Sequence, residues 1–297
     1  MDLSVSVPAT TANLGPGYDR LGLALDWRLK AVAHPAARWS VITQGEGARE
    51  LQQDETNLVA QAGARYYERQ GWQPQPLAIR VDNPIPLGRG LGSSAAAIVA
   101  GMALAQLAAD GSLDHDTLFH EAAAMEGHSD NVAAAIYGGL QEVSNEAGNR
   151  TRPLPLTRTI QVVLVIPQAT KSTAKLRAVL PAEVSAEDRA VTEAAYRAVV
   201  AGLATGDPAG LACSVEDRRH QPYRLKALPD SAGIFDIMRQ QPDVAGAYLS
   251  GAGTTVAGWV LDGNNPTRAL RKILEERGWP ATVRLIRPDH QGVIGEI

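Results

Sequence analysis

Apolar residues along this chain fall into short β-branched runs and longer stretches with helical spacing. The short runs predict strands over residues 3–7, 21–33, 39–43, 77–81, 140–143, 161–166, 245–249, 254–260 and 281–286. Helical spacing and alanine-rich composition predict helices over residues 57–70, 93–109, 114–125, 172–179, 186–204, 208–215 and 266–277. Either Thr56 or Asn57 would cap the first of these helices. Strands and helices mixed in this way predict an α+β fold.

A polar segment near the middle divides the chain into two parts. The length of 297 residues suggests about two domains. Residues 145–156 are polar and contain proline, which is typical of a domain boundary. We therefore predict one domain over residues 1–150 and a second over residues 151–297.

Composition excludes several classes of partner. The net charge of −4 gives no electrostatic basis for binding nucleic acid or an anionic membrane. Cys213 is the only cysteine, which excludes an internal disulfide and fits a reducing compartment. The N-terminal residues do not resemble a signal peptide, and the apolar run 91–109 is interpreted as a buried core helix. We expect a cytoplasmic protein without nucleic-acid or membrane partners.

A glycine-rich loop joins the predicted strand 77–81 to the predicted helix 93–109. Gly88, Gly90 and Gly92 alternate with other residues, so the backbone can adopt positive φ and turn its N–H groups inward. The following helix N-terminus, where Ser93 and Ser94 are candidate caps, favours an anion. The glycines alone fit a nucleotide site or a plain turn. They lack the Gly-Lys-Ser/Thr of a P-loop and the spacing of a dinucleotide fold.

The full string Pro86-Leu-Gly-Arg-Gly-Leu-Gly-Ser-Ser-Ala-Ala96 resembles the ATP-binding motif of the GHMP kinases. This resemblance implies that ATP is a substrate and that the whole string forms its site. The implied ATP-binding residues are Pro86, Leu87, Gly88, Arg89, Gly90, Leu91, Gly92, Ser93, Ser94, Ala95 and Ala96.

The N-terminal segment Pro8-Ala-Thr-Thr-Ala-Asn-Leu-Gly-Pro-Gly-Tyr-Asp19 narrows the resemblance to one branch. It resembles the signature of the homoserine kinase family, whereas other GHMP branches often carry a lysine that is lacking here. The resemblance implies that Asn13 and Asp19 bind the polar groups of L-homoserine. A plain turn in which these side chains bond their own backbone is the alternative.

A third block, Glu126-Gly-His-Ser-Asp-Asn131, concentrates polar side chains between two apolar helices. Taken singly, such residues are solvated groups or caps, and Asp130 could cap the next helix. Together they resemble the Glu-Gly-His-Pro-Asp-Asn block of the GHMP kinases. This implies that Glu126 and Ser94 bind Mg²⁺, a hard cation that takes few protein ligands besides phosphate. It also implies that His128 contacts the substrate while Asp130 and Asn131 lie beside the reacting hydroxyl.

Two blocks of the second half resemble the same family. Residues 171–181 match its Ser-Thr-Ala-x-x-Arg pattern, and Gln221-Pro-Tyr-Arg224 matches Glu-Pro-Tyr-Arg with Gln221 in place of glutamate. Thr173 and Arg177, four residues apart, would share a helix face. The resemblance implies that Thr173, Arg177 and Arg224 bind substrate, with both arginines on the α-carboxylate. In a weaker match, residues 249–257 carry Thr254 at the family's proline position.

The family implies an N-terminal domain like the second domain of ribosomal protein S5 and a ferredoxin-like C-terminal domain. It implies transfer of the ATP γ-phosphate to the hydroxyl of L-homoserine by a homodimer, with Asp19, Asp130 and Asn131 as the catalytic candidates. Whether Asp130 or the phosphoryl oxygens accept the proton stays open. The alternatives are another GHMP kinase acting on a different small alcohol, and an ATP-binding regulator without catalysis.

Overall fold

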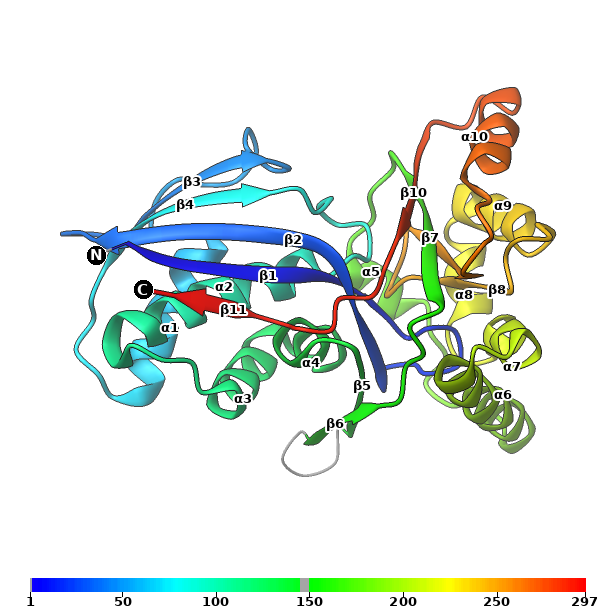
Figure 1. Cartoon of the computed structure of the whole chain (residues 1–297), viewed down its shortest axis with the longest axis horizontal. Coiled ribbons are helices and arrows are strands. Elements are labelled where there is room, and N and C mark those ends of the chain that lie inside the picture. Colours follow the sequence, from blue (N-terminus) through cyan, green and yellow to red (C-terminus); the bar gives the residue numbers. More distant parts are fainter. Residues whose placement is uncertain (1, 145–149) are drawn as a thin grey trace.

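Two β-sheets organise the protein, whose computed structural model describes residues 2–144 and 150–297 (Figure 1). The first sheet has the order β11-β1-β2-β4-β3, and β5 and β6 extend from β2. Its strands are β1 (Leu3–Ala12), β2 (Leu21–Pro35), β3 (Ser40–Gly45), β4 (Leu77–Asn83), β5 (Leu140–Ser144), β6 (Arg150–Leu154) and β11 (Ile294–Glu296). Strands β3 and β4 are parallel, and the other described pairs in this sheet are antiparallel.

Four helices cover one face of the first sheet (Figure 1). They are α1 (Leu58–Gln70), α2 (Ser93–Asp110), α3 (His115–Glu126) and α4 (Asp130–Tyr137). Helix α2 contacts β1 and the other three helices. Within the described part of the chain it alone has the length and apolar composition to cross a membrane, yet 67% of that stretch is buried inside the protein. It is the core helix that its alanine-rich sequence predicts.

The second sheet has the order β10-β7-β9-β8, with every neighbouring pair antiparallel. Its strands are β7 (Ile160–Pro167), β8 (Gly246–Leu249), β9 (Val256–Leu261) and β10 (Ala281–Ile286). The helices of this half are α5 (Thr173–Ala178), α6 (Ala186–Thr205), α7 (Pro208–Ala212), the 3₁₀ turn η1 (Cys213–Val215), α8 (Gln221–Lys226), α9 (Pro229–Met238) and α10 (Thr267–Glu276). Strand order and intervening helices follow the ferredoxin-like β-α-β-β-α-β scheme, which the family resemblance implied.

Strand β7 is buried on both faces, which explains its continuous apolar sequence. Val162 and Leu164 join the core shared with the first sheet. Val163 and Val165 instead pack in a second core that includes residues of α9 and α10. Alternation across a strand therefore connects the two cores through a single element.

The structure departs from the sequence prediction at several ends and short elements. Asn57 caps α1 as predicted, since its side chain accepts from the backbone N–H of Val59. The predicted caps of α2 were wrong: Gly92 in the left-handed region is the N-cap, and Ser93 and Ser94 are already helical. Asp130 likewise begins α4 instead of capping it. Strands β6 and β11 and helices α8 and α9 were not predicted.

The chain passes from the first sheet to the second between β6 and β7, a few residues after the predicted division at residue 150. Strand β6 pairs with β5 in the first sheet, and β7 opens the second. Residues 145–149 of the predicted boundary segment lie outside the described residues. The division at residue 150 stays a prediction.

Candidate active site

A cavity of about 240 Å³ gathers residues from both halves of the chain. Most of the residues singled out in the sequence line it. They are Asn13, Asp19, Pro86, Gly88, Arg89, Gly90, Leu91, Gly92, Ser93, Ser94, Glu126, His128, Asp130, Asn131, Thr173, Arg177 and Arg224. Leu87 lines a neighbouring cavity instead, and Ala95 and Ala96 are buried in the core. Gly251 and Ala252, from the weakly matching block 249–257, complete the wall.

The glycine loop has the backbone that its sequence predicts. Gly88, Gly90 and Gly92 have φ of 63°, 74° and 68°. A Cβ on Gly90 would lie 2.2 Å from the carbonyl oxygen of Ser250, and one on Gly92 would lie 1.8 Å from Thr10 Oγ1. The last two glycines are therefore required by close packing as well as by conformation. The loop runs directly into the N-terminus of α2, where backbone N–H groups favour an anion.

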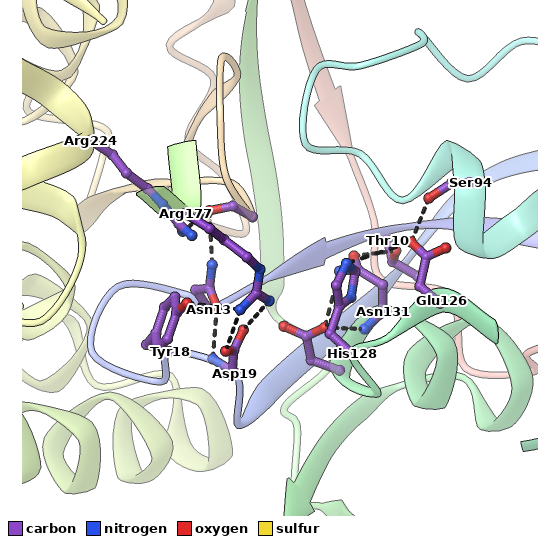
Figure 2. A network of polar contacts seen from close by, with 12 residues as sticks. Thr10, Asn13, Tyr18, Asp19, Ser94, Glu126, His128, Asn131, Arg177 and Arg224 are labelled. Carbon is purple, nitrogen blue, oxygen red and sulfur yellow. Dashed lines mark hydrogen bonds and ion pairs between the residues drawn. The ribbon is translucent and has the colours of Figure 1, made fainter. Parts of the chain in front are cut away.

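Ser94 and Glu126 form the candidate metal pair (Figure 2). The Ser94 hydroxyl donates a hydrogen bond to Glu126, whose side chain is 10% exposed. Burial raises the pKa of Glu126. The hydrogen bond from Ser94 lowers this pKa, but by less than burial raises it. Among residues 2–144 and 150–297, no group of three or more His, Cys, Asp or Glu side chains could hold a metal ion. Two hard oxygen ligands nevertheless fit Mg²⁺, which takes its other ligands from phosphate and water.

His128 and Asn131 lie beside this pair (Figure 2), and Asp130 contacts both of them. His128 Nδ1 lies 3.3 Å from Asp130 Oδ1. Burial lowers the pKa of His128, but the nearby carboxylates of Asp130 and Glu126 outweigh it and raise the pKa overall. The same Asp130 oxygen accepts from the backbone N–H and the Nδ2 of Asn131, at 2.8 and 3.2 Å. One carboxylate oxygen thus fixes two neighbouring side chains.

Thr10 is a site residue that the sequence analysis did not identify. Its hydroxyl donates to Asn131 Oδ1 at 2.8 Å, and its backbone N–H donates to the carbonyl of Leu91 in the glycine loop. Thr10 therefore connects the nucleotide loop to the Asp130–Asn131 group. Its polar side chain within the motif Pro8–Asp19, at the end of a mostly apolar strand, was the feature of the sequence that could have identified it.

At the other end of the cavity, Asp19 and Arg177 form a bidentate ion pair (Figure 2). Their two N···O distances are 2.8 and 3.0 Å, and Arg177 also donates to the hydroxyl of Tyr18. Asn13 shapes the loop that presents Asp19, since its Oδ1 accepts from the Asp19 backbone N–H and its Nδ2 donates to Gly251. Asn13 thus forms the local turn contact that we weighed as an alternative to ligand binding.

Arg224 lies behind this ion pair and is 1% exposed. Its guanidinium donates to the carbonyls of Leu176 and Gly251 and to His220 Nδ1. Burial lowers the pKa of Arg224. His220, which the sequence analysis did not consider, contacts the carbonyl of Gly15 through Nε2, and burial lowers its pKa. A neutral His220 therefore connects Arg224 to the Asp19 loop.

A second cavity of about 410 Å³ adjoins the first across Gly88, Ser93 and Ser94. Its lining is mostly apolar and includes Leu29 and Leu87. A pocket of this kind suits a flat apolar group attached to the anion held by the glycine loop. No sequence motif had indicated it.

Comparisons with known proteins agree with these observations. The family model of the GHMP kinases N terminal domain matches residues 57–139, and that of the GHMP kinases C terminal matches residues 199–278. A homoserine kinase of Moorella thermoacetica is 36% identical, covering 98% of both chains. One of Thermus thermophilus is 39% identical over 86% of this chain and 87% of its own. The crystal structure of homoserine kinase from Cytophaga hutchinsonii superposes with a TM-score of 0.87 at 24% identity, covering 99% and 97% of the two chains.

Proposed function

This chain belongs to the homoserine kinase family of the GHMP kinases, and on that premise we propose how its site works. The enzyme transfers the γ-phosphate of ATP to the side-chain hydroxyl of L-homoserine, giving ADP and O-phospho-L-homoserine. The observation that carries this function is the Asp19–Arg177 ion pair at the opposite end of the cavity from Ser94 and Glu126 (Figure 2).

The ion pair matches the two charges of an amino acid. Asp19 would bind the α-ammonium group, and Arg177, supported by the buried Arg224, would bind the α-carboxylate. Asn13 holds the Asp19 backbone in place. Thr173 and His128 line the same cavity. An alcohol without both charges would leave Asp19 and Arg177 paired with each other instead of with the substrate.

The nucleotide would occupy the other side of the site. The glycine loop and the N-terminus of α2 would bind the triphosphate, and the second cavity would hold the nucleoside. Ser94 and Glu126 would hold Mg²⁺, which would neutralise phosphate charge. Phosphoryl transfer depends mainly on positioning and charge neutralisation, so the protein does not need to form a covalent bond to the substrate.

We propose that the proton of the reacting hydroxyl passes to the phosphoryl oxygens. Asp130 Oδ1 already accepts from Asn131 and contacts His128 Nδ1. These contacts suit Asp130 to orient its neighbours more than to act as a base. The hydroxyl oxygen would bond to the γ-phosphorus as the bond to the ADP oxygen breaks, with Asn131 and His128 aiming the hydroxyl. The single cysteine also supports a reducing compartment such as the cytoplasm, and the family resemblance supports a homodimer.

A coupled ADP-release assay over a panel of small alcohols tests this function. L-homoserine, homoserinol, which lacks the carboxylate, and mevalonate, which lacks the ammonium group, would be compared at equal concentrations. We expect turnover with L-homoserine and O-phosphohomoserine as the product in phosphorus NMR. Faster turnover with mevalonate would indicate a different GHMP kinase, and no turnover with any alcohol would favour a regulator.

A further inference from the structure

Arg89, in the middle of the glycine loop, is fastened to the second half of the chain. Its Nε donates to the carbonyl of Pro167 at 3.0 Å, and its Nη2 donates to that of Gln168 at 2.8 Å. Its Nη1 donates to Leu87 within the loop at 3.1 Å. The backbone carbonyl of Arg89 accepts in turn from the N–H of Thr255. The guanidinium thus holds two segments of chain at a fixed distance.

The segment held by Arg89 leads directly to the substrate side of the cavity. Pro167 is the last residue of β7, and residues 168–172 connect it to α5. Thr254 holds this connection through a hydrogen bond to the carbonyl of Ala169. Helix α5 then presents Arg177 to Asp19. A short series of contacts therefore runs from the nucleotide loop to the amino-acid end.

We infer that Arg89 is a positioning residue that couples the binding of nucleotide and amino acid. The inference rests on the proposed function. Ordering the glycine loop around a triphosphate would fix Arg89, and Arg89 would then fix the base of the connection to α5. The second ligand would meet a site that is already ordered and would lose less conformational entropy on binding. By linkage, each ligand must tighten the other by the same factor.

This role differs measurably from that of a direct phosphate ligand. A ligand to phosphate contributes equally whether or not the amino acid is present, so its loss would leave the coupling factor unchanged. A coupling residue contributes to the coupling factor itself. Arg89→Lys separates the two, because lysine keeps the positive charge but lacks the planar fork that reaches both Pro167 and Gln168.

Isothermal titration calorimetry would measure four affinities for each protein. The ligands are Mg²⁺ with a non-hydrolysable ATP analogue, and L-homoserine, each titrated alone and with the other present. In the parent we expect mutual tightening on the order of tenfold. In Arg89→Lys we expect the coupling factor to fall to about one, whatever the change in nucleotide affinity alone, because lysine cannot reach both carbonyls. Arg80→Met, which removes an exposed arginine of β4, should keep the parent's coupling factor.

A coupling factor in Arg89→Lys equal to the parent's would overturn the inference, as would a parent without mutual tightening. A parent that binds the nucleotide but not L-homoserine would instead overturn the proposed function. Hydrogen–deuterium exchange on the parent gives a test independent of any variant's folding. The ATP analogue alone should slow exchange in residues 168–178, and slowing confined to residues 86–96 would contradict the inference.

Discussion

Gly92→Ala would test how closely the nucleotide loop packs against Thr10 and, through it, Asn131. Gly92 has φ of 68°, and an added Cβ would lie 1.8 Å from Thr10 Oγ1. Thr10 is buried and donates its hydroxyl hydrogen bond to Asn131. The new methyl group can be accommodated only if this hydroxyl turns away from Asn131.

The expected cost follows from these two effects. An alanine in the left-handed region costs about 1–2 kcal/mol. Leaving the buried Asn131 oxygen without its donor costs about 1–3 kcal/mol more. Gly127→Ala is a matched control, because Gly127 also has positive φ but a Cβ there would meet nothing within 4 Å. The control should lose only the conformational cost of about 1–2 kcal/mol in free energy of unfolding.

Urea unfolding followed by circular dichroism would measure both costs. A Thr10→Ala background removes the clashing oxygen, so Gly92→Ala made there should cost about as much as Gly127→Ala, roughly 1–2 kcal/mol. In the parent background it should cost more and should also lower kcat. If Gly92→Ala and Gly127→Ala cost the same in the parent, the reasoning from close packing is wrong.

Three further results are expected. Glu126→Gln should lower turnover at limiting Mg²⁺ by roughly 100-fold with an unchanged circular dichroism spectrum. Losing a residue that merely orients a metal ligand lowers activity about 10- to 100-fold, and Glu126 would be a ligand itself. Near-parental activity would refute the metal assignment. Arg177→Ala should raise the KM for L-homoserine about 30-fold, since a charge-assisted bidentate contact is worth on the order of 2–3 kcal/mol; an equal loss with homoserinol would show that Arg177 does not bind the carboxylate. Burial raises the pKa of Glu142, but hydrogen bonds from a tyrosine and two arginines outweigh it and lower the pKa overall. The stability this group contributes is present at neutral pH and lost as pH falls below about 4.3, so acid unfolding of Glu142→Gln should depend less on pH; identical acid-unfolding curves would contradict this.

Local sequence predicted the features that depend on local physics. The glycines of the nucleotide loop adopt positive φ because their conformational freedom is intrinsic. Asn57 caps α1 because an amide oxygen can reach a free N–H two residues on. The cap of α2 was predicted wrongly, because Gly92, in the left-handed region, takes the capping position ahead of Ser93.

Contacts between distant segments could not be predicted from local patterns. The pairing of Asp19 with Arg177 joins residues 158 positions apart, and only the folded chain brings them together. Thr10 was missed because a single polar residue on an apolar strand carries no periodic signal. His220 was missed because it lies in a polar segment, and its burial results from contacts with distant Gly15 and with Arg224. Helix α8 was missed because its six residues are too few to establish a repeat.

The position of β11 gives the chain an order of assembly. Ile294–Glu296 pair with Ser4–Ser6 of β1, so the first sheet is completed by residues that follow the whole second sheet. During synthesis, the edge of β1 that β11 covers stays unpaired until the whole second sheet has been synthesised. An unpaired strand edge is a template for aggregation. The nascent first half is therefore exposed to aggregation for the time needed to make the second half, whatever the stability of the finished enzyme.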